Sequence, residues 1–263
     1  MSDWAMHLAT RCDDAGRFNL ERVAPGSRLL AFAQGYGGDA ELDVRHTIGG
    51  PSVVELELDE RVRPLVGRVL APDGHDAPHA RVRVGVLVAD ANLPEPDPRW
   101  MPLDVRCDEL GRFKVDVAPA GFALRVLAQS DLGAPTIVEV EVNSPPNDEL
   151  VVRLAPGAEL RGVLTFNGQP AADALAIVVV DDFAPGYPDD EWFTAISDAS
   201  GRYSIRGLPA GAHMVGAMMP LATDDPWAWA KVKTDKHVAQ AREQLEFPAG
   251  ATVDWNATLE RKQ

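Results

Sequence analysis

The sequence lacks any apolar run approaching the roughly 20 residues that a membrane-spanning helix needs. Basic residues are also scarce, because 25 Lys and Arg stand against 40 Asp and Glu and give a formal net charge of −15. Such a charge repels nucleic-acid phosphates and anionic lipids, so we expect neither nucleic-acid binding nor membrane insertion. The N-terminal residues contain no basic segment followed by an apolar one, so no signal peptide is visible in the sequence.

Cysteine is nearly absent, with only Cys12 and Cys107 in 263 residues. The two cysteines occupy equivalent positions in two copies of a repeat, and such positions normally lie a domain length apart. A disulfide needs Cα atoms within about 7 Å of each other, so we expect two unpaired, half-buried thiols. A chain without disulfides can still be exported, so the redox compartment stays open.

Sequence patterns of catalysis are missing as well. No Ser or Cys has the surroundings of a nucleophile elbow, and no glycine-rich loop could cradle a phosphate. His75 and His79 lie on a Pro-containing turn without a third ligand, which argues against a zinc site. Carboxylates for glycoside hydrolysis could be chosen from any acidic loop and therefore indicate nothing. We predict a non-catalytic protein without a metal or a cofactor.

The most prominent pattern in the sequence is the motif Asp-x-x-Gly-Arg-Phe/Tyr, which occurs three times. The copies begin at Asp13, Asp108 and Asp198. In each copy a second glycine follows the motif glycine by 10 residues, and successive copies are offset by 95 and 90 residues. A period of this length corresponds to a small domain, so the chain is built from domain-sized repeats.

The motif is typical of a hairpin turn. Its Asp accepts the backbone N–H two residues on, and its Gly supplies the positive φ that the turn needs. We therefore interpret six residues as structural turn residues: Asp13, Gly16, Asp108, Gly111, Asp198 and Gly201. The aromatic residue that ends each copy then points into a core. A calcium site is the alternative, but no further oxygen ligands follow the Asp at a fixed spacing.

Alternating apolar and polar residues in the middle copy predict about seven short strands. They lie at residues 65–70, 80–88, 103–107, 112–117, 123–128, 136–142 and 149–154. The Pro-rich, acidic residues 90–98 are expected to form a loop. Strands of this number and spacing predict an all-β fold of tandem Greek-key, seven-stranded transthyretin- or immunoglobulin-like β-sandwiches.

The repeats divide the chain into three expected domains. Residues 1–60 form a partial sandwich without its N-terminal strands, 61–156 a complete one, and 157–263 a complete one with an insertion around 219–244. A mixed-charge stretch in the insertion is a candidate for one helix. Because a half-sandwich would expose its core and open strand edges, we expect the chain to be the C-terminal part of a longer protein. The alternative is that another chain contributes the missing strands.

Further residues recur at matching places in the second and third copies. In the second copy they are Gly67, Asp108, Gly111, Phe113, Pro119 and Gly121. In the third copy they are Gly162, Asp198, Gly201, Tyr203, Leu208, Pro209 and Gly211. Over residues 66–154 and 160–259, and in the half copy 1–59, the pattern resembles the carboxypeptidase regulatory-like domain, a transthyretin-like sandwich grouped with carbohydrate-binding-like folds. The resemblance implies non-catalytic modules of exported or cell-surface proteins, and it locates no site, because the matching residues are turn and core positions.

A ligand site is expected in the loops before the repeated turn. Aromatic rings beside carboxylates suit sugars, whose C–H faces stack on the rings while their hydroxyls donate to the acids. The residues that we predict for such a carbohydrate site are Tyr187, Asp189, Asp190, Trp192, Trp227 and Trp229. The alternative is that these Trp residues pack against the sandwich or between domains. Asp189, Asp190 and Glu191 could instead hold Ca²⁺ or form a solvated loop.

The sequence therefore predicts a non-catalytic structural or interaction module, an array of β-sandwiches from the C-terminal part of a larger surface or exported protein. Its expected partners are other domains of the same polypeptide, a surface protein or a glycan. The alternative is a carbohydrate-binding module that uses the Trp residues of the last domain. An accessory domain that stabilises a catalytic domain encoded upstream is a third hypothesis, which the sequence does not separate from the first.

Overall fold

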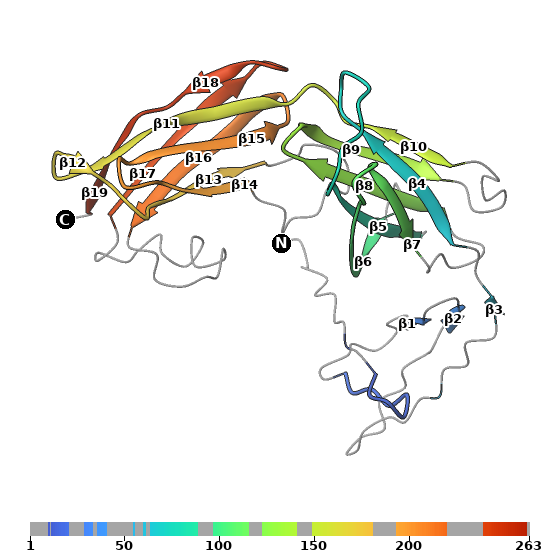
Figure 1. Ribbon diagram of the computed structural model, residues 1–263. Helices are drawn as coiled ribbons and strands as arrows, with labels where there is room; N and C mark the ends of the chain where they lie inside the picture. Colours follow the sequence, from blue (N-terminus) through green and yellow to red (C-terminus); the bar gives the residue numbers. More distant parts are fainter. Residues whose placement is uncertain are drawn as a thin grey trace.

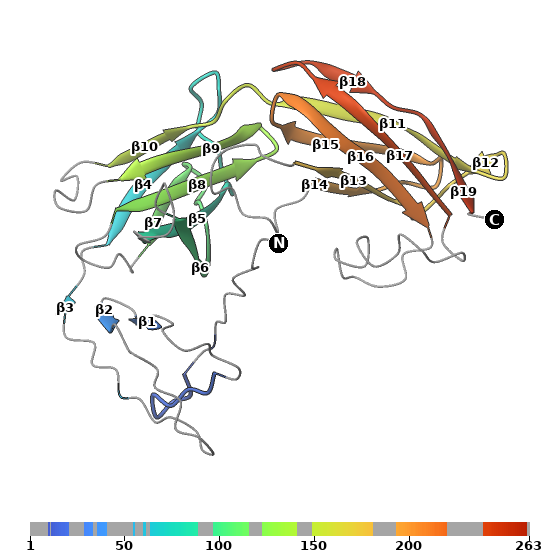
Figure 2. The ribbon, with the colours of Figure 1, turned by 180° about the vertical axis from the view of Figure 1, so that it is seen from behind.

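The structure is a computed structural model, drawn as a ribbon in Figure 1 and from behind in Figure 2. It describes residues 10, 12–20, 29–33, 36–40, 55, 60–61, 64–88, 97–115, 123–140, 149–180, 193–219 and 239–261. These residues form strands and turns, and no helix occurs among them. The described part of the chain accordingly offers no helix that is long and apolar enough to cross a membrane.

The strands follow the repeats along the chain. The first repeat contains β1 (Leu29–Ala33), β2 (Tyr36–Ala40) and β3 (Glu60–Arg61). The second contains β4 (Leu65–Leu70), β5 (Arg81–Val88), β6 (Asp97–Arg106), β7 (Arg112–Val115), β8 (Leu124–Ser130), β9 (Gly133–Val140) and β10 (Leu150–Arg153). The third contains β11 (Ala158–Phe166), β12 (Gln169–Pro170), β13 (Leu175–Val179), β14 (Phe193–Ile196), β15 (Arg202–Leu208), β16 (Gly211–Met219), β17 (Ala239–Phe247), β18 (Thr252–Asp254) and β19 (Ala257–Arg261).

Strands β4 to β10 form one β-sandwich, called the middle sandwich below. Its two sheets have the strand orders β10-β4-β7 and β6-β5-β8-β9. The pair β4–β10 is parallel, and the other strand pairs of these two sheets are antiparallel. The first two strands therefore both lie inside a sheet, β4 between β10 and β7 and β5 between β6 and β8.

Strands β11 to β19 form a second sandwich, called the last sandwich, with the same arrangement. β11 pairs with β15 in antiparallel and with β18 in parallel, as β4 does with β7 and β10. The other sheet runs β14-β13-β16-β17, which repeats the order β6-β5-β8-β9. β19 pairs with both β11 and β17 and joins the two sheets along one side. The predicted all-β sandwich fold is confirmed, and its strand order occurs twice.

Each sandwich has its own core, because alternate residues of a strand point to opposite faces of the sheet. The core of the middle sandwich includes Val69, Val82, Val84, Phe113, Val126 and Leu154. The core of the last sandwich includes Leu160, Val178, Tyr203, Phe247, Trp255 and Leu259. The aromatic residues that end the second and third motifs, Phe113 and Tyr203, thus both lie in a core.

The loop predicted at residues 90–98 extends too far toward the C-terminus. β6 already begins at Asp97 and runs in antiparallel register with β5, where Trp100 pairs with Gly85. The proline content suggested a loop, but Pro98 lies near the start of an edge strand, where a missing N–H is tolerated. Trp100 is therefore a strand residue and does not lie in a loop.

The insertion expected around 219–244 begins and ends in strands, and the helix suggested for a mixed-charge stretch within it is wrong for the described residues 239–244. Met219 ends β16, and residues 239–244 belong to β17, which pairs with β16 from Gly211↔Phe247 to Met219↔Ala239. Cross-strand pairing along the whole of β16 overrides the local mixed-charge pattern. Residues 220–238 lie outside the described residues. The inserted stretch thus connects two strands of one hairpin, where the middle sandwich has the short turn between β8 and β9.

The first repeat contributes a smaller sheet of order β1-β2-β3. β1 and β2 form an antiparallel hairpin, and Tyr36 of β2 pairs with Arg61 of β3. Leu29 at the start of β1 lies 95 residues before Leu124 at the start of β8, which is the offset between the first two motifs. The hairpin β1–β2 is therefore the counterpart of β8–β9. The domain boundaries given above stay predictions.

Candidate functional site

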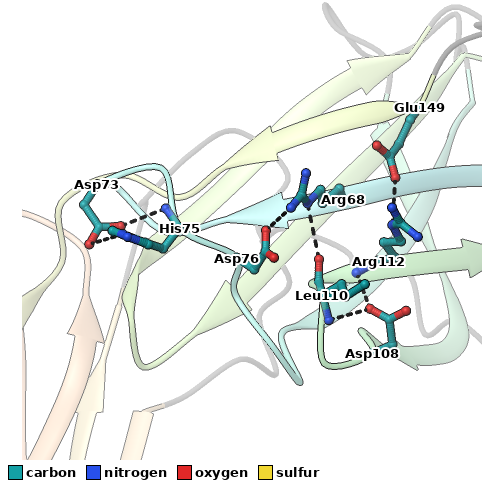
Figure 3. Close-up of polar contacts among 8 residues, drawn as sticks. All are labelled: Arg68, Asp73, His75, Asp76, Asp108, Leu110, Arg112 and Glu149. Carbon is teal, nitrogen blue, oxygen red and sulfur yellow. Dashed lines mark hydrogen bonds and ion pairs between the residues drawn. The ribbon is translucent and has the colours of Figure 1, made fainter.

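The repeated motif forms a closed turn whose Asp side chain accepts two backbone N–H groups. In the second copy, Asp108 Oδ1 accepts from Leu110 N at 2.9 Å and from Arg112 N at 2.8 Å. Figure 3 shows these two contacts. Gly111 has a φ of 69°, a conformation that a residue with a side chain adopts only at a cost.

The turns of the other two copies have the same geometry. Asp13 Oδ1 accepts from Ala15 N at 3.0 Å and Arg17 N at 2.8 Å, and Gly16 has a φ of 74°. Asp198 Oδ1 accepts from Ser200 N at 2.8 Å and Arg202 N at 2.9 Å, and Gly201 also has a φ of 74°. In all three copies the Asp side chain therefore accepts backbone N–H groups of its own turn, and the Gly supplies the positive φ that the turn needs.

These hydrogen bonds also act on the acidity of the motif carboxyls. The backbone N–H of Arg112 is the main cause that lowers the pKa of Asp108, and the Ser200 hydroxyl is the main cause that lowers the pKa of Asp198. A carboxyl with a lowered folded-state pKa stabilises the fold above its unfolded-state pKa. That contribution is lost as the pH falls through the folded-state pKa, so both turns weaken in acid below about pH 4.

Around the second turn, charged side chains form isolated pairs on the outer face of the sheet β10-β4-β7. Arg68 forms an ion pair with Asp76, and its Nε donates to Leu110 O at 3.3 Å. Arg112 Nε lies 3.7 Å from Glu149 Oε1. Figure 3 shows that these pairs lie side by side without converging on a common point. The Arg112–Glu149 pair is exposed, and ion pairs of that kind contribute little to stability, whereas the Arg68–Asp76 pair is partly buried.

The two histidines of the middle copy do not converge either. His75 Nδ1 lies 3.1 Å from Asp73 Oδ2, whereas His79 Nε2 lies 3.4 Å from Glu109 Oε1. Each imidazole therefore faces a different carboxylate. Within the described ranges, no three His, Cys, Asp or Glu side chains gather closely enough to hold a metal ion.

The residues predicted for a carbohydrate site lie outside the described residues. They are Tyr187, Asp189, Asp190, Trp192, Trp227 and Trp229. A tryptophan of the last sandwich that the structure does describe has a structural role: Trp255 is buried and donates from Nε1 to Glu243 Oε2 at 2.8 Å. The carbohydrate site stays a prediction.

The expectation of two half-buried thiols is wrong, although both cysteines are unpaired. Cys12 is exposed, whereas the side chain of Cys107 is 3% exposed and lies in the core of the middle sandwich. Burial, followed by the negative charge of Asp108, raises the pKa of Cys107 to about 11. Equivalent positions in the repeat thus have different surroundings, since Cys107 packs among the core residues of the middle sandwich and Cys12 is exposed.

We expect iodoacetamide at pH 8 to label the native chain once, at Cys12. With a pKa of about 11, only about one Cys107 thiol in a thousand is ionised at that pH, and it is also inaccessible. Intact-mass spectrometry should show one label in the native chain and two labels in urea. A Cys12→Ser variant is the control and should stay unlabelled until it is unfolded. Native labelling of Cys107 at the rate of Cys12 would contradict the buried position.

No protein-family model matches the chain, and neither does any curated protein. Among solved structures, a minor pilin of Streptococcus agalactiae is 11% identical with a TM-score of 0.35, over 77% of this chain and 97% of that one. The shaft pilin SpaA of Lactobacillus rhamnosus GG is 10% identical with a TM-score of 0.27, over 76% of this chain and 98% of that one. The Bacillus anthracis TIE protein is 12% identical with a TM-score of 0.28, over 75% of this chain and 34% of that one. At these TM-scores the similarity supports no inference about the function of this chain.

Proposed function

We propose that the chain is a non-catalytic structural and interaction module, a rigid array of β-sandwiches that holds other parts of a larger surface or exported protein at a set spacing. The observation that carries this proposal is the junction between the middle and last sandwiches. The carboxypeptidase regulatory-like identity of the sandwiches and the exported location belong to the same proposal and are supported by the sequence resemblance.

The connection between the two sandwiches is short, and its first residues, Leu154 and Ala155, are hydrogen-bonded to the middle sandwich. β10 ends at Arg153 and β11 begins at Ala158. Ala155 O accepts from Ala134 N of β9 at 2.9 Å, and Ala155 N donates to Thr136 Oγ1 at 3.2 Å. Figures 1 and 2 show β11 leaving the end of the middle sandwich directly. A connection with these bonds has little freedom to act as a hinge.

Glycines allow the backbones of the two sandwiches to touch. A Cβ on Gly207 of β15 would lie 2.4 Å from Ser130 O, at the turn between β8 and β9. A Cβ on Gly157 in the connection would lie 2.7 Å from Ala134 N and 3.0 Å from Gly207 Cα. A Cβ carbon does not approach other heavy atoms this closely without a shift of the neighbouring backbone, so both positions favour glycine. This close fit supports a fixed angle between the sandwiches, whereas loosely joined domains move relative to each other by default.

We expect Gly207→Ala to change the angle between the sandwiches, because the new methyl group must displace the Ser130 backbone. Small-angle X-ray scattering of the full chain should show an altered distance distribution. Gly250→Ala is the matched control, because Gly250 has a φ of 71° beside the 73° of Gly207 but no atom nearer than 3.9 Å. Both variants carry the same backbone strain of about 1 kcal/mol. Unchanged scattering from Gly207→Ala would contradict the rigid array.

A carbohydrate-binding role for the last sandwich remains a second proposal, supported by the Trp and acidic residues of its loops. Some gels will contain a polysaccharide that binds the unchanged chain and slows its migration. We expect Trp192→Ala and Trp229→Ala each to abolish this retardation, because sugar binding of this kind depends on stacking against aromatic rings. Affinity electrophoresis over a panel of soluble polysaccharides measures this. Trp255→Phe is a control for the loss of a Trp outside the loops. If both loop variants migrate as the unchanged chain does in every gel, the second proposal fails.

A further inference from the structure

A hollow of about 490 Å³ lies on the middle sandwich, where β5 begins and β6 and β8 end, beside the turn between β8 and β9. Six of its eight lining residues carry polar or charged side chains. The residues that matter below are His79, Arg81, Arg106, Gln129, Ser130 and Asp131. Its volume falls within the range of about 300 to 1,000 Å³ that is usual for small-molecule sites.

The strand register places three of these side chains in one row. Arg81 of β5 pairs directly with Arg106 of β6 on one side and with Gln129 of β8 on the other. Directly paired residues of antiparallel strands project from the same face of a sheet. The next residue, Val82, is buried in the core, so the row faces outward. Two guanidinium groups and one amide are thus presented together.

Arg81 and Arg106 place two like charges directly opposite each other on the sheet. The last sandwich shows that the fold does not need them. In the equivalent strands β13, β14 and β16, Leu175 pairs with Ile196 and with Met218. Leu175 and Met218 are buried and Ile196 is 51% exposed, so the same place carries an apolar row there. The strand arrangement therefore does not by itself require the charged row of the middle sandwich.

We propose that this hollow binds a carboxylate-bearing sugar, a uronic acid residue of an acidic saccharide, with Arg81 and Arg106 holding its carboxylate. Guanidinium groups bind carboxylates through paired N–H donors, which gives both strength and orientation. A hollow that is rich in Arg is unusual in a chain of net charge −15, and it is suited to an anion. The hollow is lined by residues of the middle sandwich, and its Ser130 and Asp131 also border the junction with the last sandwich.

The remaining groups favour a sugar over a densely acidic peptide. Asp131 also lines the hollow and repels a second carboxylate, but its oxygens accept hydrogen bonds from hydroxyls. The Ser130 hydroxyl donates to Asp131 Oδ1 and accepts from Leu132 N, both at 3.3 Å, and the Gln129 amide can both donate and accept. One carboxylate beside several hydroxyls, the pattern of a uronic acid, matches this set. A peptide of consecutive acidic residues would bring a second negative charge to Asp131.

The backbone orients one of the two arginines. His79 has a φ of 58°, which turns its carbonyl toward Arg106, and Arg106 Nη1 donates to His79 O at 3.4 Å. The equivalent residue of the last sandwich, Asp173, has a similar φ of 56°, so this turn belongs to the fold. In the middle sandwich the same turn therefore also positions a guanidinium group at the hollow.

Titration of the full chain with tri-galacturonate, followed by calorimetry and by NMR, tests the proposal. We expect saturable binding that Arg106→Gln weakens by about tenfold or more, the effect of losing a charged hydrogen-bond partner. The triple variant Arg81→Leu, Arg106→Ile, Gln129→Met gives the middle sandwich the three apolar residues that the last sandwich has at these positions. It should keep its fold, because the same strand arrangement accepts these residues, and it should not bind. Its far-UV circular dichroism and thermal unfolding establish that it is folded.

The controls separate a site from general attraction by charge. Arg112→Gln removes one exposed positive charge from the other sheet of the same sandwich and should leave the affinity unchanged. Neutral tri-galactose and poly-glutamate should not bind. The proposal is overturned if tri-galacturonate gives no saturable signal up to about 10 mM, or if Arg112→Gln weakens binding as much as Arg106→Gln. Binding of poly-glutamate in place of the saccharide would overturn it as well.

Discussion

Replacing Gly111 by alanine is expected to destabilise the middle sandwich by about 3 kcal/mol, whereas Gly16→Ala should cost only about 1 kcal/mol. The two glycines hold the same place in the same motif and have φ values of 69° and 74°. The backbone strain of a side chain at positive φ is therefore shared. The difference in stability must come from what surrounds each turn.

The surroundings of the two turns differ sharply. A Cβ on Gly111 would lie 2.5 Å from Val69 O and 3.1 Å from Ala77 N, whereas a Cβ on Gly16 would meet nothing within 4 Å. Gly111 O also accepts from Val69 N at 2.8 Å, so the turn is bonded to β4. An added methyl group would push the turn away from that strand and weaken this bond.

Hydrogen exchange followed by mass spectrometry across a urea series measures the effect for each sandwich separately. Separate readings are needed because a chain of several sandwiches need not unfold in a single two-state step. Gly111→Ala should shift the unfolding of peptides from residues 64–115 and leave peptides of the last sandwich unchanged. Equal shifts for Gly111→Ala and Gly16→Ala would show that backbone strain alone explains the motif glycine.

Gly162→Ala is expected to destabilise the last sandwich by about 3 kcal/mol or more, although Gly162 lies in the middle of a strand. A Cβ at this position would lie 1.8 Å from Trp255 O and 2.6 Å from Trp255 C, both of which are backbone atoms. The carbonyl of Trp255 also accepts from the buried Tyr203 hydroxyl at 2.8 Å. The added methyl group would separate β11 from the segment around Trp255 and strain this bond.

The same exchange measurement on peptides from residues 158–180 and 239–261 checks this prediction. Gly168→Ala is the control, because Gly168 has a φ of 76° in the hairpin turn after β11 and no neighbour within 4 Å. Tyr203→Phe, which removes only the hydroxyl, should cost about 1 kcal/mol. If Gly162→Ala is no more destabilising than Gly168→Ala, the close approach at Trp255 does not limit this position.

Local patterns were enough to predict most strands and all three turns. Alternation in Arg112–Val115 is matched by alternating exposure in β7, because a period of two is a property of any half-buried strand. The prediction failed where partners in space decide the outcome. β17 is a strand because it pairs with β16 along its whole length, and β6 begins at Asp97 because β5 lies beside it.

The row of Arg81, Arg106 and Gln129 could not be predicted from local patterns either. Alternation in residues 80–84 indicates that Arg81 points away from the core, and nothing more. Arg106 and Gln129 lie 25 and 48 residues further along the chain, and no spacing in the sequence connects them. They meet Arg81 only because β6 and β8 pair with β5 on its two sides. The comparison with Leu175, Ile196 and Met218 also needs the register of the last sandwich.

The sequence alone determined the repeat, the sandwich fold and the turn that each motif forms, because these depend on backbone preferences and on patterns within a few residues. Only the tertiary structure decided which glycines carry a close contact, which cysteine is buried and which side chains share a surface. Those properties depend on atoms from strands far apart in the chain. The motif glycines illustrate the division: positive φ at Gly16, Gly111 and Gly201 follows from the turn, whereas the contacts of Gly111 with Val69 and of Gly201 with Leu164 follow from the sandwich.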